Sequence, residues 1–200
     1  MRKTNYPPGR AFDPDVDPDS MIFSALSWYS VVHKLEQNLP KWTAESPHLY
    51  NGILTANPIL LPFAVETALK AWYWRDHKKA PPMKHHLLPL FDSLNPTSQD
   101  LLNQRISTLQ LCLKNQPDTP KNLHKTSLRE TLSLHNDTFV LWRYPTHYKL
   151  SHIKVPSLRL ALAVISDSYE KNFAIPQAKL YGDDCQICGL PSGQHSYRLY

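Results

Sequence analysis

Two cysteines near the C-terminal end of the chain have the spacing of a metal-binding pair. Cys185 and Cys188 are followed by Gly189, as in the C-x-x-C-G form of a zinc knuckle, where the glycine lets backbone donors approach a thiolate sulfur. A closed structural zinc site has four ligands, and His195 is the nearest further one, with adjacent aspartates or a second subunit as completions. The sequence therefore predicts zinc at Cys185, Cys188 and His195, or else an ordinary thiol pair in the tail.

A second group that could do chemistry lies in the strongest apolar run of the chain, Phe63 to Trp74. Glu66 and Lys70 stand one helical turn apart there, in the favourable acid-first order. One interpretation is that they mark the solvated edge of a core helix. The other is a partly buried ion pair that organises a polar pocket with His85 or His86 from the following segment.

The elements that position these residues are predicted from the prolines. The chain has 18 prolines against 5 glycines, and proline is excluded from helix interiors, so the proline-free intervals show where long helices lie. Apolar residues recur at helical spacing within these intervals. The predicted helices are about 20–38, the interval between Pro62 and Pro81 as the most buried helix, a short one at 86–94, 97–113, one within 121–144, and a last one after Pro156 ending near Asn172.

The interval 121–144 places His135 inside an apolar seam. Leu128, Leu132, Phe139 and Trp142 share its face at spacings of three and four. The fold prediction is an all-α, up-down bundle of about five longer helices plus one short helix. The chain is expected to comprise an acidic, proline-rich N-terminal segment (1–19), the helical domain (20–172) and an irregular C-terminal tail (173–200).

Composition narrows the functional classes. The first twenty residues lack an apolar run, which argues against a signal peptide, and no uninterrupted apolar stretch approaches the length of a membrane span. Three cysteines without a disulfide-scaffold pattern suit a reducing compartment, so we expect a cytoplasmic protein without a membrane partner. The scarcity of glycine argues against phosphate-cradling loops, and the core is expected to need no cofactor.

Two stretches resemble the HEPN superfamily of small helical-bundle proteins. In the first, Glu66, Leu69 and Lys70 match the E-x-x-L-K core helix. His86, Leu87 and Leu88 match the following "HDLL" segment, without the usual acidic residue after the histidine. In the second, the "FV-x-W-R-Y" helix end is matched by Phe139, Val140, Trp142, Arg143 and Tyr144. The likeness covers about residues 20–172.

The resemblance implies a helical domain that often dimerises and, in active members, cleaves RNA without metal by an arginine followed after four to six residues by a histidine. Arg129 and His135 have that spacing, although Glu130 follows the arginine where active members have Asn, Asp or His. His135 would act as general acid or base and Arg129 would stabilise the phosphorane charge. On a straight helix the two diverge, so convergence needs a helix break or a partner subunit. The alternative is a hydrogen-bonded core histidine.

Basic residues are concentrated between Lys121 and Arg159, with seven basic against two acidic side chains. Part of this stretch combines cationic side chains, which could follow a phosphate backbone, with aromatic rings, which could stack on bases. The alternative is that it forms a solvated loop. The predicted RNA-binding residues are Arg143, His147, Tyr148, Lys149, His152 and Lys154. Two hypotheses follow. One is an HEPN-like domain associated with RNA or a defence or toxin–antitoxin system, with endoribonuclease activity and an antitoxin as partner. The other is a catalytically inactive interaction module that forms a homodimer.

Overall fold

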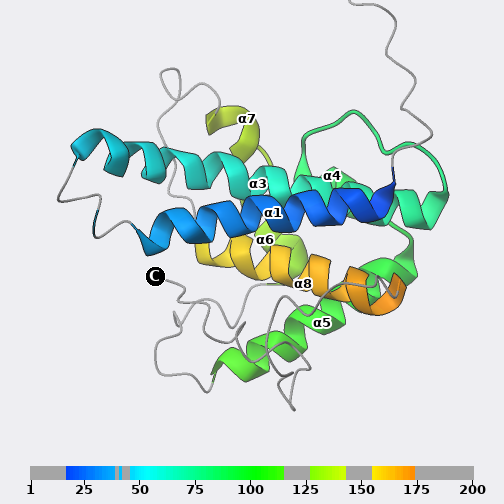
Figure 1. Ribbon diagram of the computed structural model, residues 1–200. Helices are drawn as coiled ribbons and strands as arrows, with labels where there is room; N and C mark the ends of the chain where they lie inside the picture. The colour runs from blue at the N-terminus through cyan, green and yellow to red at the C-terminus, as the bar shows by residue number, and fades with distance from the viewer. Residues whose placement is uncertain (1–16, 39–40, 42–45, 115–126, 143–154, 174–200) are drawn as a thin grey trace, which may run out of the picture.

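A computed structural model describes residues 17–38, 41, 46–114, 127–142 and 155–173 of the chain. Regular structure within these ranges is entirely α-helical, which confirms the predicted all-α bundle (Figure 1). The helices, labelled as in Figure 1, are α1 (Pro18–Gln37), α3 (Pro47–His77), α4 (Leu87–Asp92), α5 (Pro96–Lys114), α6 (Leu128–Leu134), α7 (Thr138–Trp142) and α8 (Val155–Phe173).

Helix α1 begins where its capping residues dictate. The side chain of Asp17 accepts a hydrogen bond from the Asp19 N–H at 3.1 Å, and Pro18 occupies the first turn, where its missing donor is harmless. Ile22, Ala25, Tyr29 and other apolar residues at helical spacing form the buried face. The helix therefore starts two residues before the predicted start at residue 20.

The prediction that prolines mark the helix boundaries is wrong for helix α3. The sequence predicted a helix beginning after Pro62, but α3 begins at Pro47 and passes through both Pro58 and Pro62. An interior proline removes a backbone hydrogen bond and costs about 3 kcal/mol. Both proline rings are buried, as is Leu61 between them, and we attribute the continuity of the helix to its packing against α1 over this region.

By length and composition α3 could cross a bilayer, with a mean hydropathy of 1.4 over an 18-residue window. However, 56% of that window is buried against the other helices. Burial of this extent is expected of a core helix of a bundle, so the apolar composition of α3 is accounted for within the fold.

The predicted helix within 121–144 is split at His135. Helix α6 begins with a capping box formed by Ser127 and Glu130 and ends at Leu134, and α7 begins at Thr138. The turn between them contains Asn136 and Asp137, whose short polar side chains form hydrogen bonds with Leu88, in the first turn of α4, and with His86, just before it. Such residues compete with helical hydrogen bonding, which explains the break.

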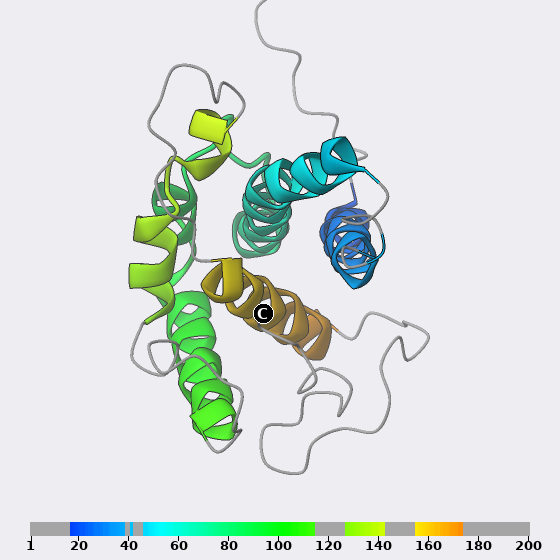
Figure 2. The ribbon, with the colours of Figure 1, turned by 90° about the vertical axis from the view of Figure 1, so that its left-hand side faces the viewer.

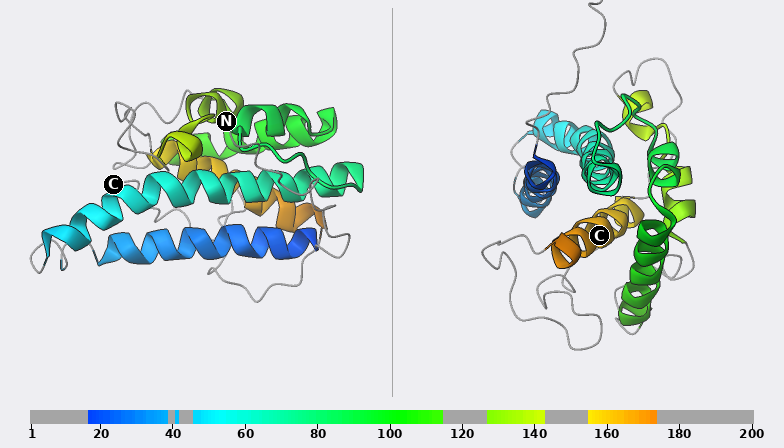
Figure 3. Two further views of the ribbon diagram at one scale, coloured as in Figure 1. Left: turned by 90° about the horizontal axis from the view of Figure 1, so that it is seen from above. Right: turned by 90° about the vertical axis from the view of Figure 1, so that its right-hand side faces the viewer.

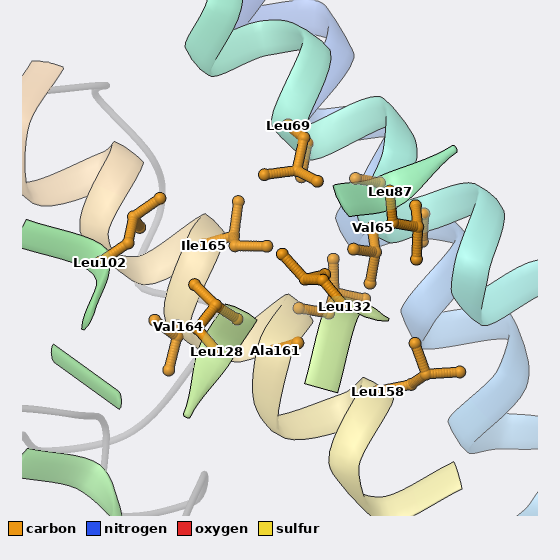
Figure 4. Packing of buried hydrophobic residues seen from close by; sticks show 14 of the residues in the cluster. Val65, Leu69, Leu87, Leu102, Leu128, Leu132, Leu158, Ala161, Val164 and Ile165 are labelled. Atoms are coloured by element: carbon orange, nitrogen blue, oxygen red, sulfur yellow. The ribbon is translucent and has the colours of Figure 1, made fainter. Parts of the chain in front are cut away.

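The bundle is arranged around α8. Helices α1 and α3 lie side by side and antiparallel, and α8 lies between that pair and the α5 and α6 side (Figures 2 and 3). Every side chain of α8 from Ser157 to Tyr169 except Ala163 is buried, so over this length α8, and not α3 as predicted, is the most buried helix. The core residues of α8, including Leu158, Ala161 and Ile165, pack against residues of α3, α5 and α6 (Figure 4).

Candidate functional site

The carboxylate of Glu66 is the centre of a polar group inside the bundle. Its side chain is 3% exposed and that of Lys70 is 15% exposed, and the Lys70 Nζ lies 2.6 Å from Glu66 Oε1. On the other side, Nδ1 of His85 lies 3.0 Å from Oε1 and 3.2 Å from Oε2. The pair is therefore the partly buried ion pair and not the solvated edge of a core helix.

The histidine that joins this group is His85, and not the adjacent His86, which the sequence offered as the other candidate. His86 bonds through Nδ1 to Asp137 at 2.8 Å, and both of those side chains are about half exposed. Adjacent residues of an extended segment point in opposite directions, which explains why only one of the two reaches Glu66. The sequence identified the carboxylate and its lysine but did not distinguish between the two histidines.

Aromatic rings extend from His85 along the surface of α3. The ring of His85 lies 5.6 Å from that of Phe139, Phe139 stacks on Phe63 at 5.5 Å, and Phe63 meets the edge of Trp28 at 6.0 Å. These contacts join α7 to α3 and α1. The side chain of His85, which connects this row of rings to Glu66, is 47% exposed.

Arg129 and His135 have separate partners. The guanidinium of Arg129 forms a bidentate ion pair with Asp92, with Nη2 3.0 Å from Oδ2, at the surface of α4. His135 is 2% exposed, and its Nε2 lies 3.1 Å from the Ser157 hydroxyl. The helix break that convergence requires is present, but it directs the imidazole into the core. The arrangement described is that of a hydrogen-bonded core histidine.

The other predicted site residues lie outside the described residues. They are the RNA-binding group Arg143, His147, Tyr148, Lys149, His152 and Lys154, and the zinc ligands Cys185, Cys188 and His195. Among the side chains that are described, no group of three or more His, Cys, Asp or Glu residues is placed to hold a metal ion. Zinc in the tail and RNA bound by residues 143–154 stay predictions.

Sequence reasoning missed a polar cluster at the beginning of α1. Arg75 forms an ion pair with Asp19, and its Nε donates to the Tyr169 hydroxyl at 2.8 Å, while that hydroxyl donates to Asp19 Oδ1 at 2.8 Å. Burial raises the pKa of Tyr169, and the Arg75 guanidinium opposes that rise. Burial lowers the pKa of Arg75, but its bonds to Asp19 and Tyr169 outweigh that effect and raise it.

A second missed cluster lies at the other end of α1. Arg159, 3% exposed, forms an ion pair with Glu36, which also accepts a hydrogen bond from the Asn57 amide. Burial lowers the pKa of His33, and the charges of Arg159 and Lys34 lower it further. Arg159 is the lone charge in an apolar stretch of α8, and that isolation was the signal available in the sequence.

Comparison with protein-family models, with curated protein sequences and with solved structures finds no match to this chain. The resemblance to the HEPN superfamily therefore rests on the motifs in the sequence.

Proposed function

We propose that this protein is a catalytically silent helical module that pairs with a second copy of itself through the outer face of α1. This face comprises seven exposed residues, namely Ser20, Phe23, Ser24, Ser27, Trp28, Ser30 and Val31. No residue from Ser20 to Val32 is charged, although charged residues make up 20% of the chain. That charge-free outer face is the observation that supports the proposal, because interface cores are depleted in charged residues.

Three serine hydroxyls of this face already have hydrogen-bond acceptors within α1. The hydroxyls of Ser24, Ser27 and Ser30 donate to carbonyls one turn earlier in α1, at 2.9, 2.8 and 2.9 Å. A buried hydroxyl without a hydrogen bond is costly, but these donors are already satisfied by their own helix. Covering the face therefore carries a small desolvation penalty.

The shape of the face favours pairing with itself. Phe23, Trp28 and Val31 are 60%, 38% and 43% exposed and alternate with serines at spacings of three and four residues. When two such helices pack together, large side chains enter the spaces above small ones, as in knobs-into-holes packing. A second copy supplies both the large and the small residues that this fit requires.

Charge at the two ends of α1 selects an antiparallel pair. Asp17 lies exposed at the N-terminal end of the face and Lys34 lies exposed at the C-terminal end. An antiparallel partner brings the Lys34 end of one copy to the Asp17 end of the other. The opposed helix dipoles also favour this direction. A chain of net charge +5 meets little repulsion along the uncharged length between these ends.

The contacts of Arg129 and His135 support a silent module over a ribonuclease. A metal-independent nuclease needs a histidine that reaches the ribose hydroxyl and a cation that reaches the phosphate. His135 is buried against Ser157, and the guanidinium of Arg129 is engaged by Asp92. Endoribonuclease activity, an antitoxin partner and a role in defence stay predictions of the sequence resemblance.

The test of the proposal is the oligomeric state of a Phe23→Glu variant. Light scattering coupled to size-exclusion chromatography should show a dimer for the wild-type chain. For the variant the dissociation constant should rise about 10- to 100-fold, because the burial of a phenylalanine is lost and a charge is placed between the helices.

A matched control places the same charge elsewhere. Leu134 is 57% exposed on α6, so Leu134→Glu should leave the dimer unchanged. A wild-type chain that stays monomeric at high concentration, or a dimer that tolerates Phe23→Glu, would contradict the proposal. Circular dichroism should show that both variants keep the helical fold.

A further inference from the structure

We infer that the loop between α3 and α4 binds the phosphate backbone of a single-stranded nucleic acid. The loop runs from Lys78 to His86, and the chain contains no acidic residue between His77 and Phe91. Lys78, Lys79, Lys84, His85 and His86 are all exposed. This surface is called the basic loop below, and it lies at the opposite end of α3 from Pro47.

The basic loop is held in place at both ends. Lys78 ends α3 in the left-handed conformation, with φ of 51° and its N–H bonded to the Trp74 carbonyl at 2.8 Å. At the other end, His85 is held by Glu66 and His86 by Asp137. Pro81 in the middle is buried. Because the backbone is fixed, binding orders few residues and loses little conformational entropy.

The carboxylates around the basic loop are already engaged. Asp76 accepts hydrogen bonds from the Asn95 N–H and the Ser98 hydroxyl, both at 2.7 Å, and Asp92 is paired with Arg129. Glu66 and Asp137 hold the two histidines.

Lys78, Lys79 and Lys84 form no ion pair within the described residues, although Lys79 lies over the Tyr73 ring at 6.0 Å. Their positive charge is therefore not neutralised by the part of the chain that the structure describes, and an external anion would meet three ammonium groups there.

The chemistry around these lysines favours a nucleic acid over a lipid surface. The cations are distributed along the loop, Lys79 lies over the Tyr73 ring, and the exposed His85 and His86 follow Lys84 in the chain, which suits a charged backbone with bases that stack on flat rings. Membrane-surface segments add Trp, Phe or Leu side chains that enter the bilayer. In this loop the one large exposed apolar side chain is Met83, at 84%.

The experiment compares charge removal with charge retention at two lysines. Binding of a fluorescein-labelled, mixed-sequence, 20-nucleotide single-stranded RNA is followed by anisotropy for the wild type, Lys79→Gln/Lys84→Gln and Lys79→Arg/Lys84→Arg. The glutamine variant should bind about 25-fold more weakly at 0.1 M salt, and its log–log salt dependence should become shallower by about 1.4, because each lost phosphate contact removes about 0.7 from the slope. The arginine variant should bind like the wild type.

Controls separate this site from other sources of positive charge. Lys41→Gln removes an exposed lysine outside the basic loop and should change binding by much less than the glutamine pair. Wild-type protein that binds no RNA, a glutamine variant that binds as tightly as the wild type with the same salt slope, or capture by phosphatidylserine vesicles without RNA binding would each overturn the inference. Circular dichroism should be the same for all variants.

Discussion

The hydroxyl of Tyr169, near the end of α8, donates a hydrogen bond to the carboxylate of Asp19, in the first turn of α1, at 2.8 Å. The two residues are 150 positions apart in the chain, and Arg75 of α3 contacts both. The contact joins the first, second and last long helices at one point. It fixes the N-terminal end of α1 against the helix around which the bundle is built.

Tyr169→Phe removes the shared hydroxyl and keeps the buried ring. We expect the free energy of unfolding to fall by about 1–2 kcal/mol, because Asp19 and Arg75 each lose a hydrogen bond. Urea denaturation followed by tryptophan fluorescence measures the change. Tyr73→Phe is the matched control, since the contacts of Tyr73 with His77 and Lys79 are made by its ring. Equal losses in the two variants would contradict the role of the hydroxyl.

The same hydroxyl makes the fold sensitive to alkali. Burial raises the pKa of Tyr169 above its ordinary value, so the folded state favours the neutral form. Its stabilising contribution is complete below pH 10, the ordinary tyrosine pKa being about 10, and is lost as the pH rises above that value. The wild type should therefore lose stability above pH 10 more steeply than Tyr169→Phe.

The ion pair of Glu66 and Lys70 is expected to stabilise the fold only as a pair. Glu66→Gln leaves a largely buried ammonium without its partner and should lower the free energy of unfolding by roughly 3 kcal/mol. The double variant Glu66→Leu/Lys70→Met replaces both charges with apolar groups and should recover most of that loss. A double variant at least as unstable as Glu66→Gln would show that the pair is needed in its charged form.

Mild acid should weaken the fold through His33. Burial, with the nearby charges of Arg159 and Lys34, lowers the pKa of His33, so its neutral form is favoured in the folded state. The contribution of neutral His33 to stability is fully present above the ordinary histidine pKa of about 6.5. It is lost as the pH falls through the lowered pKa that His33 has in the folded state. His33→Gln should flatten the decline of melting temperature below pH 6.5. The exposed-residue control His48→Gln should leave the decline as in the wild type.

His135→Ala tests whether the arginine–histidine spacing has a catalytic meaning. Its imidazole is buried against Ser157, so we expect lower thermal stability and no effect on RNA. Mixed RNA incubated with the wild type in chelator should stay intact on a denaturing gel. Cleavage by the wild type that is lost in a folded His135→Ala variant would restore the ribonuclease hypothesis. Arg129→Gln should then lose cleavage as well.

Local patterns in the sequence predicted most of the fold. The spacing of Ile22, Ala25 and Tyr29 defined α1 to within two residues, because burial of one face is a local property, whereas the cap at Asp17 was not predicted. The start of α3 was predicted incorrectly because Pro58 and Pro62 are tolerated inside a helix when tertiary packing outweighs the lost hydrogen bond. The helix break at His135 depends on contacts of Asn136 and Asp137 with a segment about 50 residues away.

The candidate site was predicted only in part, for a related reason. Helical spacing identified Glu66 and Lys70, which lie on one helix. Periodicity carries no information on which side chain from another segment arrives beside them, and so it did not choose between His85 and His86. Contacts such as those of Arg129 with Asp92 and of Arg159 with Glu36 join separate helices and are determined by the packing of the whole bundle.

The burial of α8 has a consequence for the order of folding during synthesis. Helices α1 and α3 leave the ribosome early and can pair, but α8, which packs against α1, α3, α5 and α6, is the last of the described helices to be made. Until Pro156 and the residues after it have been translated, the apolar surfaces that face α8 stay exposed on the growing chain. We therefore expect this protein to complete its core only late in synthesis, and its nascent chain to expose apolar surface of the kind that chaperones shield.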